Sequence, residues 1–211
     1  FAHYTKRHYP PGCKGFLSKG ERMVTEYELK NGLRDGLFKR WWSNGKLQKE
    51  EMYTKGRPDG ASRTWYKNGQ LRSVINWKMG WFHGKWSDWD EEGFLIREEH
   101  YKNDHTHGYI RSWFGGTEQL YGEAYYEKGQ LVGPQRYWHF NGNLKEDTDS
   151  HYRKTWHENG QLFEEEQRKN WVLHGWVTAY DSTGKLLSKE PFVEGTGTLM
   201  RYHESGKLES E

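Results

Sequence analysis

The chain repeats one pattern of apolar and polar positions along most of its length. An aromatic residue is followed, usually four positions later, by a glycine and then, two positions on, by a leucine. The copies are Trp41/Gly45/Leu47, Trp65/Gly69/Leu71, Trp89/Gly93/Leu95, Trp113/Gly116/Leu120, Trp138/Gly142/Leu144, Trp156/Gly160/Leu162, Tyr180/Gly184/Leu186 and Tyr202/Gly206/Leu208. The leucines lie 24, 24, 25, 24, 18, 24 and 22 residues apart. Self-similarity at such a period indicates a repeat protein.

Glycines divide each copy into two short segments that each carry apolar residues. A second glycine precedes the aromatic residue in phase, at Gly36, Gly60, Gly84, Gly108, Gly133, Gly175 and Gly197. Short segments bounded by glycine turns are typical of β-hairpins, and no segment shows helical spacing without a glycine in it. We therefore predict an all-β fold, an elongated array of antiparallel hairpins in a single twisted or curved sheet. The repeats are expected over residues 21–211, after an irregular N-terminal arm at 1–20.

The turn before the leucine predicts the register of each hairpin. Its glycine follows residues as different as Asn68 and Thr183, and a β-branched residue resists positive φ. A three-residue loop in which only the glycine is left-handed, forming a β-bulge, suits every copy. We expect this register to place Trp65 opposite Leu71, with Trp77 on the same face.

Charged residues also recur in phase with the repeat. Basic residues occupy one position of the first segment, at Lys39, Arg63, Arg111, Arg136 and Lys154. The expected register places Arg136 opposite Glu146 and Lys154 opposite Glu164, which favours cross-strand ion pairs over a basic binding stripe. The 32 basic and 30 acidic residues are interspersed, so we do not expect nucleic-acid binding.

One copy departs strongly from the period. Six residues are missing between Gly142 and Gly160, and the acidic stretch 146–149 replaces the usual second turn. The pattern leaves the strand pairing of this copy open.

The composition makes large rings the main source of buried apolar surface, because 33% of the residues are hydrophobic and 17% are aromatic. We expect a structural ladder at Trp41, Trp65, Trp89, Trp113, Trp138, Trp156, Tyr180 and Tyr202. The one cysteine, Cys13, cannot form a disulfide within the chain. No apolar run is long enough to span a membrane. The compartment stays unknown: we lean towards the cytoplasm, and the lack of an initial Met leaves a secreted or periplasmic form open.

The recurring motif resembles the MORN-repeat variant family. Its best copies are the segments 65–71 (WYKNGQL) and 156–162 (WHENGQL), with a second turn at Gly56–Gly60 and Gly80–Gly84. The resemblance covers roughly residues 24–211. It implies an antiparallel hairpin array, and it suggests either a bacterial antitoxin-type protein or a scaffold of the kind that is sometimes linked to membrane lipids.

No constellation of residues predicts catalysis, a metal site or a cofactor. His83, His107 and His174 share one repeat position, but equivalent positions two strands apart lie about 9.5 Å from each other, whereas metal ligands lie about 2 Å from a shared ion. A role in stabilising turns is the preferred interpretation.

Rings outside the ladder are the candidate binding residues, because one sheet cannot bury both of its faces. They are Trp42, Tyr66, Trp81, Phe82, Tyr109, Trp171 and Trp176. We expect them to be exposed and to bind another protein, in a non-enzymatic scaffold of antitoxin, immunity or assembly type. The alternative is a module that binds glycans or a membrane surface through the same rings.

Overall fold

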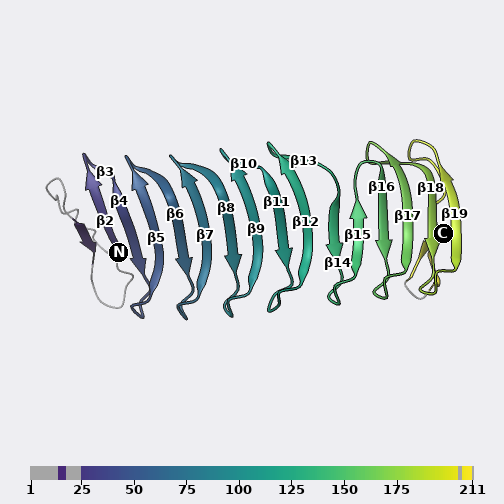
Figure 1. The fold of residues 1–211 in the computed structure, drawn as a ribbon, viewed down its shortest axis with the longest axis horizontal. Helices are drawn as coiled ribbons and strands as arrows, with labels where there is room; N and C mark the ends of the chain where they lie inside the picture. The colour runs from purple at the N-terminus through teal and green to yellow at the C-terminus, as the bar shows by residue number, and fades with distance from the viewer. Residues whose placement is uncertain (1–13, 18–24, 204–205, 211) are drawn as a thin grey trace. The chain divides into compact units, whose positions relative to one another are not determined.

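The computed structural model describes residues 14–17, 25–203 and 206–210, which form antiparallel β-hairpins and no helix (Figure 1). The hairpins make an open sheet that does not close into a barrel, so the predicted fold class is confirmed. The described residues accordingly contain no helix that could cross a membrane. The chain divides into two compact units, residues 1–108 and 109–211.

The first unit contains one short strand followed by hairpins in chain order. Cys13 and most of the expected arm lie outside the described residues, but Lys14–Leu17 of that arm forms a strand that pairs with the next one. The strands are β1 (Lys14–Leu17), β2 (Thr25–Lys30), β3 (Leu33–Arg34), β4 (Gly36–Trp41), β5 (Leu47–Thr54), β6 (Arg57–Trp65), β7 (Leu71–Lys78), β8 (Trp81–Trp89), β9 (Leu95–Lys102) and β10 (His105–Thr106). From β4 to β9, each strand pairs with the next.

The second unit repeats this arrangement with shorter strands in its first half. The strands are β11 (Gly108–Trp113, whose first residue belongs to the first unit), β12 (Leu120–Glu127), β13 (Gln130–Leu131), β14 (Gln135–Trp138), β15 (Leu144–Thr148), β16 (Tyr152–Trp156), β17 (Leu162–Lys169), β18 (Val172–Tyr180), β19 (Leu186–Phe192), β20 (Arg201–Tyr202) and β21 (Leu208–Ser210). The last two form a separate two-stranded sheet.

Two kinds of turn alternate along each unit. In the turn before each leucine the glycine alone is left-handed, as at Gly69 with φ 96°. The Tyr66 amide donates to the Gln70 carbonyl at 2.9 Å, which closes the expected three-residue loop. The other described turns, except the one between β15 and β16, are two-residue loops with positive φ at both residues, as at Lys55 and Gly56, which is the type I′ geometry that suits twisted hairpins.

The second glycine of the repeat lies in the first strand, and not in a tight turn, at Gly36, Gly60, Gly84, Gly108 and Gly175. Gly175 has a φ of 112°, and a β-carbon there would lie 2.9 Å from the β-carbon of Gln167 on the neighbouring strand. Only glycine allows the two strands to approach so closely while the strand bends.

The predicted register is right at the ladder and wrong by one residue beyond it. Trp65 pairs with Leu71, but Thr64 pairs with Ser73, so the bulge leaves one extra residue on the second strand. Trp77 therefore lies on the opposite face from Trp65, because successive residues of a strand point to opposite faces. We call the face with Trp65 the ladder face.

Because of the same shift, both predicted ion-pair partners are wrong by one residue. Arg136 pairs with Asp147 and not with Glu146, while Lys154 pairs with Glu165 and not with Glu164. The bulge adds one residue after each leucine, and this moves every later partner by one position.

The shortened copy keeps its strand pairing. β15 and β16 pair from Glu146/Thr155 to Thr148/Arg153. In place of the usual turn, the Asp149 carboxylate accepts the His151 amide at 2.7 Å and the Tyr152 amide at 3.1 Å. The missing residues thus shorten both strands without breaking the hairpin.

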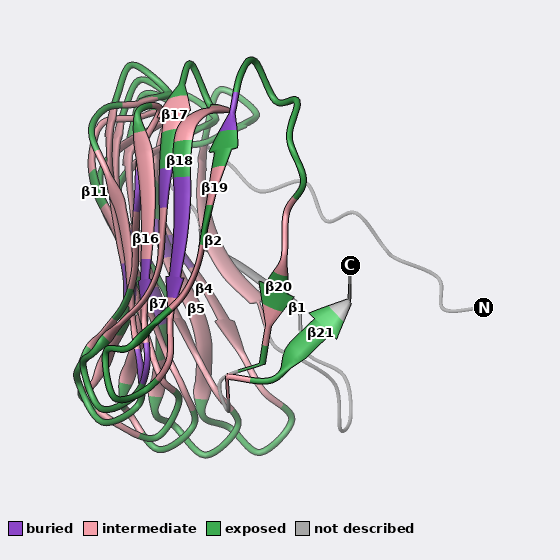
Figure 2. Cartoon of the chain, turned by 90° about the vertical axis from the view of Figure 1, so that its right-hand side faces the viewer, coloured by how far each residue is buried: buried purple, intermediate pink, exposed green. Residues whose placement is uncertain are grey.

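Burial is concentrated in the middle of the strands (Figure 2). Phe38, Glu51, Ser62 and Glu99 are buried there, and they share the face opposite the ladder face. That face therefore carries most of the buried side chains of the first unit, including two carboxylates that need partners.

Candidate functional site

Asparagines in the three-residue turns connect each hairpin to the next. The Asn68 side chain accepts the Gln70 amide at 2.8 Å and donates to the Glu91 carbonyl of the following turn at 2.9 Å. Asn44, Asn141 and Asn159 make equivalent bonds to the next turn. This side chain stabilises its own turn and also fixes the distance to its neighbour.

The residue after each ladder aromatic forms a second bond between repeats. The Trp42 indole donates to the Trp65 carbonyl at 3.0 Å, and the Tyr66 hydroxyl donates to the Trp89 carbonyl at 2.8 Å. His139 and His157 bond the equivalent carbonyls of Trp156 and Tyr180. These four residues therefore share one structural role, whereas Asp90 and Asp181 at the same position accept amides of their own turns.

The structure separates the predicted exposed rings into two groups. Trp81, Tyr109, Trp171 and Trp176 are 53%, 41%, 50% and 44% exposed. The expectation of exposure is wrong for Trp42, Tyr66 and Phe82, which are half-buried. Trp42 and Tyr66 turn towards the next repeat to make their hydrogen bonds, and Phe82 stacks on Trp77 with 4.3 Å between ring centroids.

Trp171 has an unusual backbone conformation. Its φ is 70°, in a type I′ turn with Asn170, at a position that other copies fill with Gly56, Gly80 or Gly195. A left-handed conformation costs a bulky L-residue on the order of 1–2 kcal/mol. The structure thus keeps an exposed tryptophan in a position that favours glycine.

The eight ladder aromatics all lie at the paired ends of their strands and are half-buried. Trp65, for example, faces Leu71, and Trp89 faces Leu95. No ladder ring is fully buried.

Two of the three histidines that share one repeat position near the second turn contact the turn of the next repeat, whereas the buried Nδ1 of His107 has no partner among the described residues. Nδ1 of His83 lies 3.2 Å from Oδ1 of Asn103, and Nδ1 of His174 lies 3.4 Å from the Glu194 amide. Asp59, at the equivalent position of another repeat, accepts the Met79 amide at 3.1 Å. The part of the chain that the structure describes brings no three His, Cys, Asp or Glu side chains together as metal ligands.

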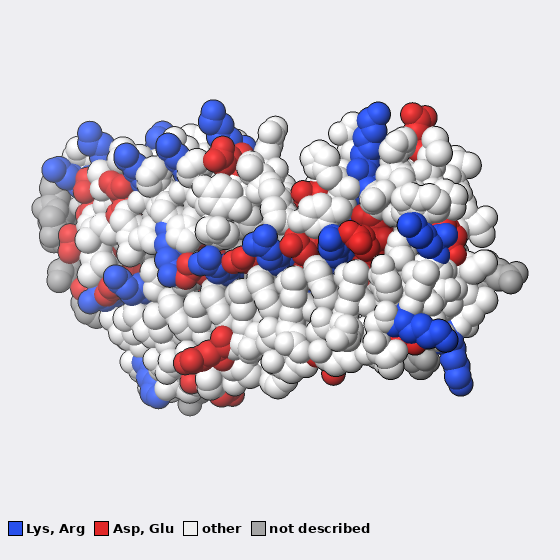
Figure 3. Space-filling model, turned by 45° about the vertical axis from the view of Figure 1, so that its right-hand side comes forward, with Lys and Arg blue, Asp and Glu red and all other residues white. Residues whose placement is uncertain are grey.

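Ion pairs run across the strands on the ladder face. In the first unit, Glu50 lies between Lys39 and Arg63, at 3.8 Å and 3.6 Å. In the second unit, Arg136 lies between Glu123 and Asp147, at 3.8 Å and 3.4 Å. Figure 3 shows the resulting alternation of basic and acidic side chains. The charges largely compensate one another, which leaves little net charge for a ligand.

The buried carboxylates of the opposite face are held by residues of their own strand. Glu51 pairs with Lys49 at 2.9 Å and accepts the Tyr53 hydroxyl at 2.7 Å. Glu99 pairs with Arg97 and accepts the Tyr101 hydroxyl. Burial, the bond to Glu99 and the charge of Glu99 raise the pKa of Tyr101 to about 12. Burial followed by Glu51 raises the pKa of Tyr53 in the same way.

A denser charge cluster lies on that face of the second unit. Arg153 contacts Glu146, Glu164 and Glu166 at 3.1, 3.0 and 3.0 Å. Burial and the charge of Glu166 raise the pKa of Glu164, and Arg153 opposes this shift. The Arg153 guanidinium thus connects its own strand to the strands on both sides. Its ion pairs explain why three glutamates can lie close together here.

A groove of about 500 Å³ opens in the first unit. Its wall includes Trp42, Tyr66 and Trp86 together with the basic side chains of Arg40, Lys49 and Arg72. Two of the predicted binding residues, Trp42 and Tyr66, are therefore part of a concave surface.

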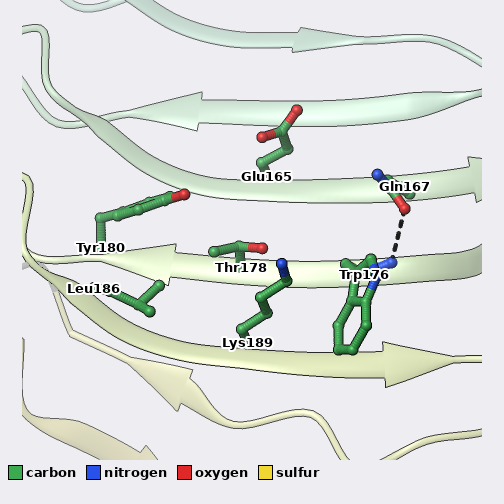
Figure 4. Close-up of a pocket in the computed structure, with 7 residues that line it drawn as sticks. All are labelled: Glu165, Gln167, Trp176, Thr178, Tyr180, Leu186 and Lys189. Atoms are coloured by element: carbon green, nitrogen blue, oxygen red, sulfur yellow. Dashed lines mark hydrogen bonds between the residues drawn. The ribbon is translucent and has the colours of Figure 1, made fainter.

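A second, smaller pocket of about 330 Å³ lies over β17, β18 and β19 (Figure 4). Trp176 forms one side, with the Lys189 ammonium 4.7 Å from its ring centroid. Gln167 accepts the Trp176 amide at 2.9 Å, and Glu165 lines the pocket while pairing with Lys154. An exposed ring beside several polar groups is an arrangement that can bind a small polar ligand.

Sequence comparison identifies the repeating unit. The segments 34–55, 58–79, 82–103 and 152–170 match the family model described as MORN repeat variant. These segments are MORN-variant repeats. No curated protein matches the chain.

The first three matched MORN-variant repeats are consecutive hairpins with regular turns. Each of the first three runs from the end of one second turn to the next, for example 58–79. The segment 104–151, which holds both irregular copies, lies between the matches, and Trp171 directly follows the last match. The protein is therefore a scaffold of β-hairpin repeats of this family across residues 34–170.

Proposed function

We propose that the protein is a non-enzymatic repeat scaffold that binds another protein through exposed tryptophans. The observation that supports this is that each unit has such a ring at a two-residue turn or directly after one: Trp81 follows the Met79–Gly80 turn in the first unit, and Trp171 lies in a turn of the second. Turn formation requires neither ring, and exposed tryptophans contribute strongly to the binding energy of protein interfaces. Tyr109 and Trp176 extend the candidate set.

The backbone of Trp171 gives further support to this proposal. Strained residues persist where the surrounding structure or a function retains them. A glycine would satisfy this turn at lower cost, so a retained tryptophan fits a role in recognition. An antitoxin, immunity or assembly role is the form of protein binding that the resemblance to bacterial MORN-variant proteins favours.

Capture of a partner from the native source, identified by mass spectrometry, tests this function. We expect Trp81→Ser and Trp171→Gly each to reduce capture at least about tenfold, as the loss of an interface hot spot does, while circular dichroism stays unchanged. Val132→Ser, which alters an exposed apolar residue outside the candidate set, is the control. Undiminished capture by both tryptophan variants would contradict the proposal.

Glycan binding is the second candidate, and the pocket beside Trp176 favours it. A glycan array separates the two functions. Binding of a defined sugar by the parent, lost in Trp176→Ser and kept in Trp81→Ser, would support glycan binding in place of protein binding.

A further inference from the structure

We propose that the groove of the first unit binds an extended, acidic segment of a partner protein. This site is separate from the exposed Trp81, so it adds a second mode of recognition to the proposed function. The argument depends on the hydrogen-bonding groups, the charges and the rings that line the groove.

Two polar groups in the groove wall have no hydrogen-bond partner. The Ser73 hydroxyl belongs to a side chain that is only 8% exposed, and Oε1 of Gln48 is also buried. Neither atom has a partner among the described residues. Buried polar groups are normally satisfied, so these two side chains gain partners if they turn outward to a ligand that offers an acceptor to Ser73 and a donor to Gln48. The carbonyl and amide groups of an extended peptide backbone supply both.

The charges of the groove favour an acidic ligand. Lys49 is paired with Glu51. Asp88 accepts the Trp86 indole at 2.9 Å and keeps its negative charge, so Arg40 and Arg72 together leave the groove with one net positive charge. Arg40 and Arg72 have no carboxylate within 4.0 Å in the described part of the chain, and their guanidinium groups lie beside rings. These two groups are placed to form bidentate bonds with carboxylates.

The rings of the groove add apolar contact area. Arg72 lies over the Tyr66 ring at 5.5 Å from its centroid, and Trp42 and Trp86 line the same wall. Side chains of an extended segment alternate in direction. A segment with acidic residues at alternate positions can therefore turn all of them towards Arg40 and Arg72 on this wall.

Fluorescence anisotropy with labelled synthetic peptides tests the inference on the full chain. The probes are twelve-residue peptides in which Glu and Phe alternate, with matched peptides that carry Gln or Lys in place of Glu. We expect the Glu peptide to bind, and the Gln and Lys peptides to bind at least about tenfold more weakly. Arg40→Gln and Arg72→Gln should each weaken binding of the Glu peptide by about tenfold or more.

The control variant is Arg63→Gln, which removes the same charge from the ladder face of the neighbouring strand. It should leave affinity for the Glu peptide within about twofold. Equal binding of the Lys peptide, or equal losses in Arg63→Gln and Arg72→Gln, would overturn the inference. Vesicles that contain phosphatidylserine test an anionic membrane surface as the ligand. The inference would be overturned if the parent binds these vesicles, Arg40→Gln does not, and the Glu peptide does not bind at all.

These outcomes are independent of the exposed tryptophans. Trp81→Ser leaves the groove wall intact and should bind the Glu peptide like the parent. If Trp81→Ser loses partner capture and the parent does not bind the Glu peptide, the groove is rejected as a binding site and the proposed function is kept.

Discussion

At the scale of single residues, side chains that contact the next repeat explain positions that vary in residue type. Trp42, Tyr66, His139 and His157 differ in size and polarity, yet each bonds the carbonyl of the next ladder aromatic. A requirement for one polar atom at the end of a ring allows several residue types. Variation along a repeat is thus compatible with a constant structural role, and it is not by itself evidence of a binding patch.

Replacing Trp171 by glycine should stabilise the protein. The substitution removes a left-handed bulky residue, and we expect the free energy of unfolding to rise by about 1 kcal/mol. Urea unfolding of Trp171→Gly measures the change. Gly80→Ala, which adds a side chain at the equivalent left-handed position, should destabilise the protein by a similar amount. A loss of stability in Trp171→Gly would show that the ring contributes packing energy that exceeds its strain.

Tyr101 should make stability depend on pH in the alkaline range. Its pKa is about 12 in the folded chain and about 10 when unfolded. Because the folded state holds the proton more tightly, the stabilisation is complete below pH 10 and is lost as the pH rises towards 12. Unfolding measured between pH 9 and 12 should show a shallower loss for Tyr101→Phe. Identical slopes for parent and variant would contradict the bond to Glu99.

At the scale of the hairpin, turn chemistry and contacts between turns act together. The three-residue loop sets where the leucine lies, and the asparagine ties that loop to the next one. Each hairpin is therefore positioned by its neighbour as well as by its own sequence.

Asn68 allows these two roles to be measured separately. Asn68→Ala removes both bonds and should cost about 1–2 kcal/mol. Asn68→Asp keeps an acceptor for the Gln70 amide but loses the donor to Glu91, so its cost should be smaller. Hydrogen exchange should show faster exchange near residue 91 in both variants. Equal stability of all three proteins would mean that the bond between turns contributes nothing.

The fold and the loop type followed from the sequence because glycine spacing and the ladder residues act within one hairpin. The sequence did not predict the face on which Trp77 lies or the cross-strand partners of Arg136 and Lys154. One extra residue in the bulge moves every later side chain of the strand to the opposite face of the sheet. The exposure of Trp42 and Tyr66 depends on the neighbouring hairpin, which local pattern does not describe. The groove arises from several strands together, and no single repeat motif signals it.

At the scale of the whole molecule, each compact unit is stabilised mainly by contacts between successive hairpins. In such arrays the total stability is close to a sum of repeat and nearest-neighbour contributions. A defect in one repeat should therefore spread first to the adjacent strands and leave distant ones protected.

Trp89→Ala tests this behaviour within the first unit. Removal of this half-buried ring should cost about 2–3 kcal/mol, below the roughly 3–5 kcal/mol for truncation of a fully buried aromatic residue. Hydrogen exchange should increase first in β8 and β9, then in β7, and last in β4. Phe94→Ala, at an exposed ring in the same hairpin, should cost less than about 1 kcal/mol. Uniform loss of protection across the unit would contradict nearest-neighbour stabilisation.

The central claim is that this scaffold binds another protein through its exposed tryptophans. The most direct measurement is hydrogen exchange on the complex formed with the protein that co-purifies from the native source. We predict a stoichiometric complex in which the turns around Trp81 and Trp171 become protected. Purification of the chain without any stoichiometric partner, or a footprint that avoids both turns, would contradict the claim.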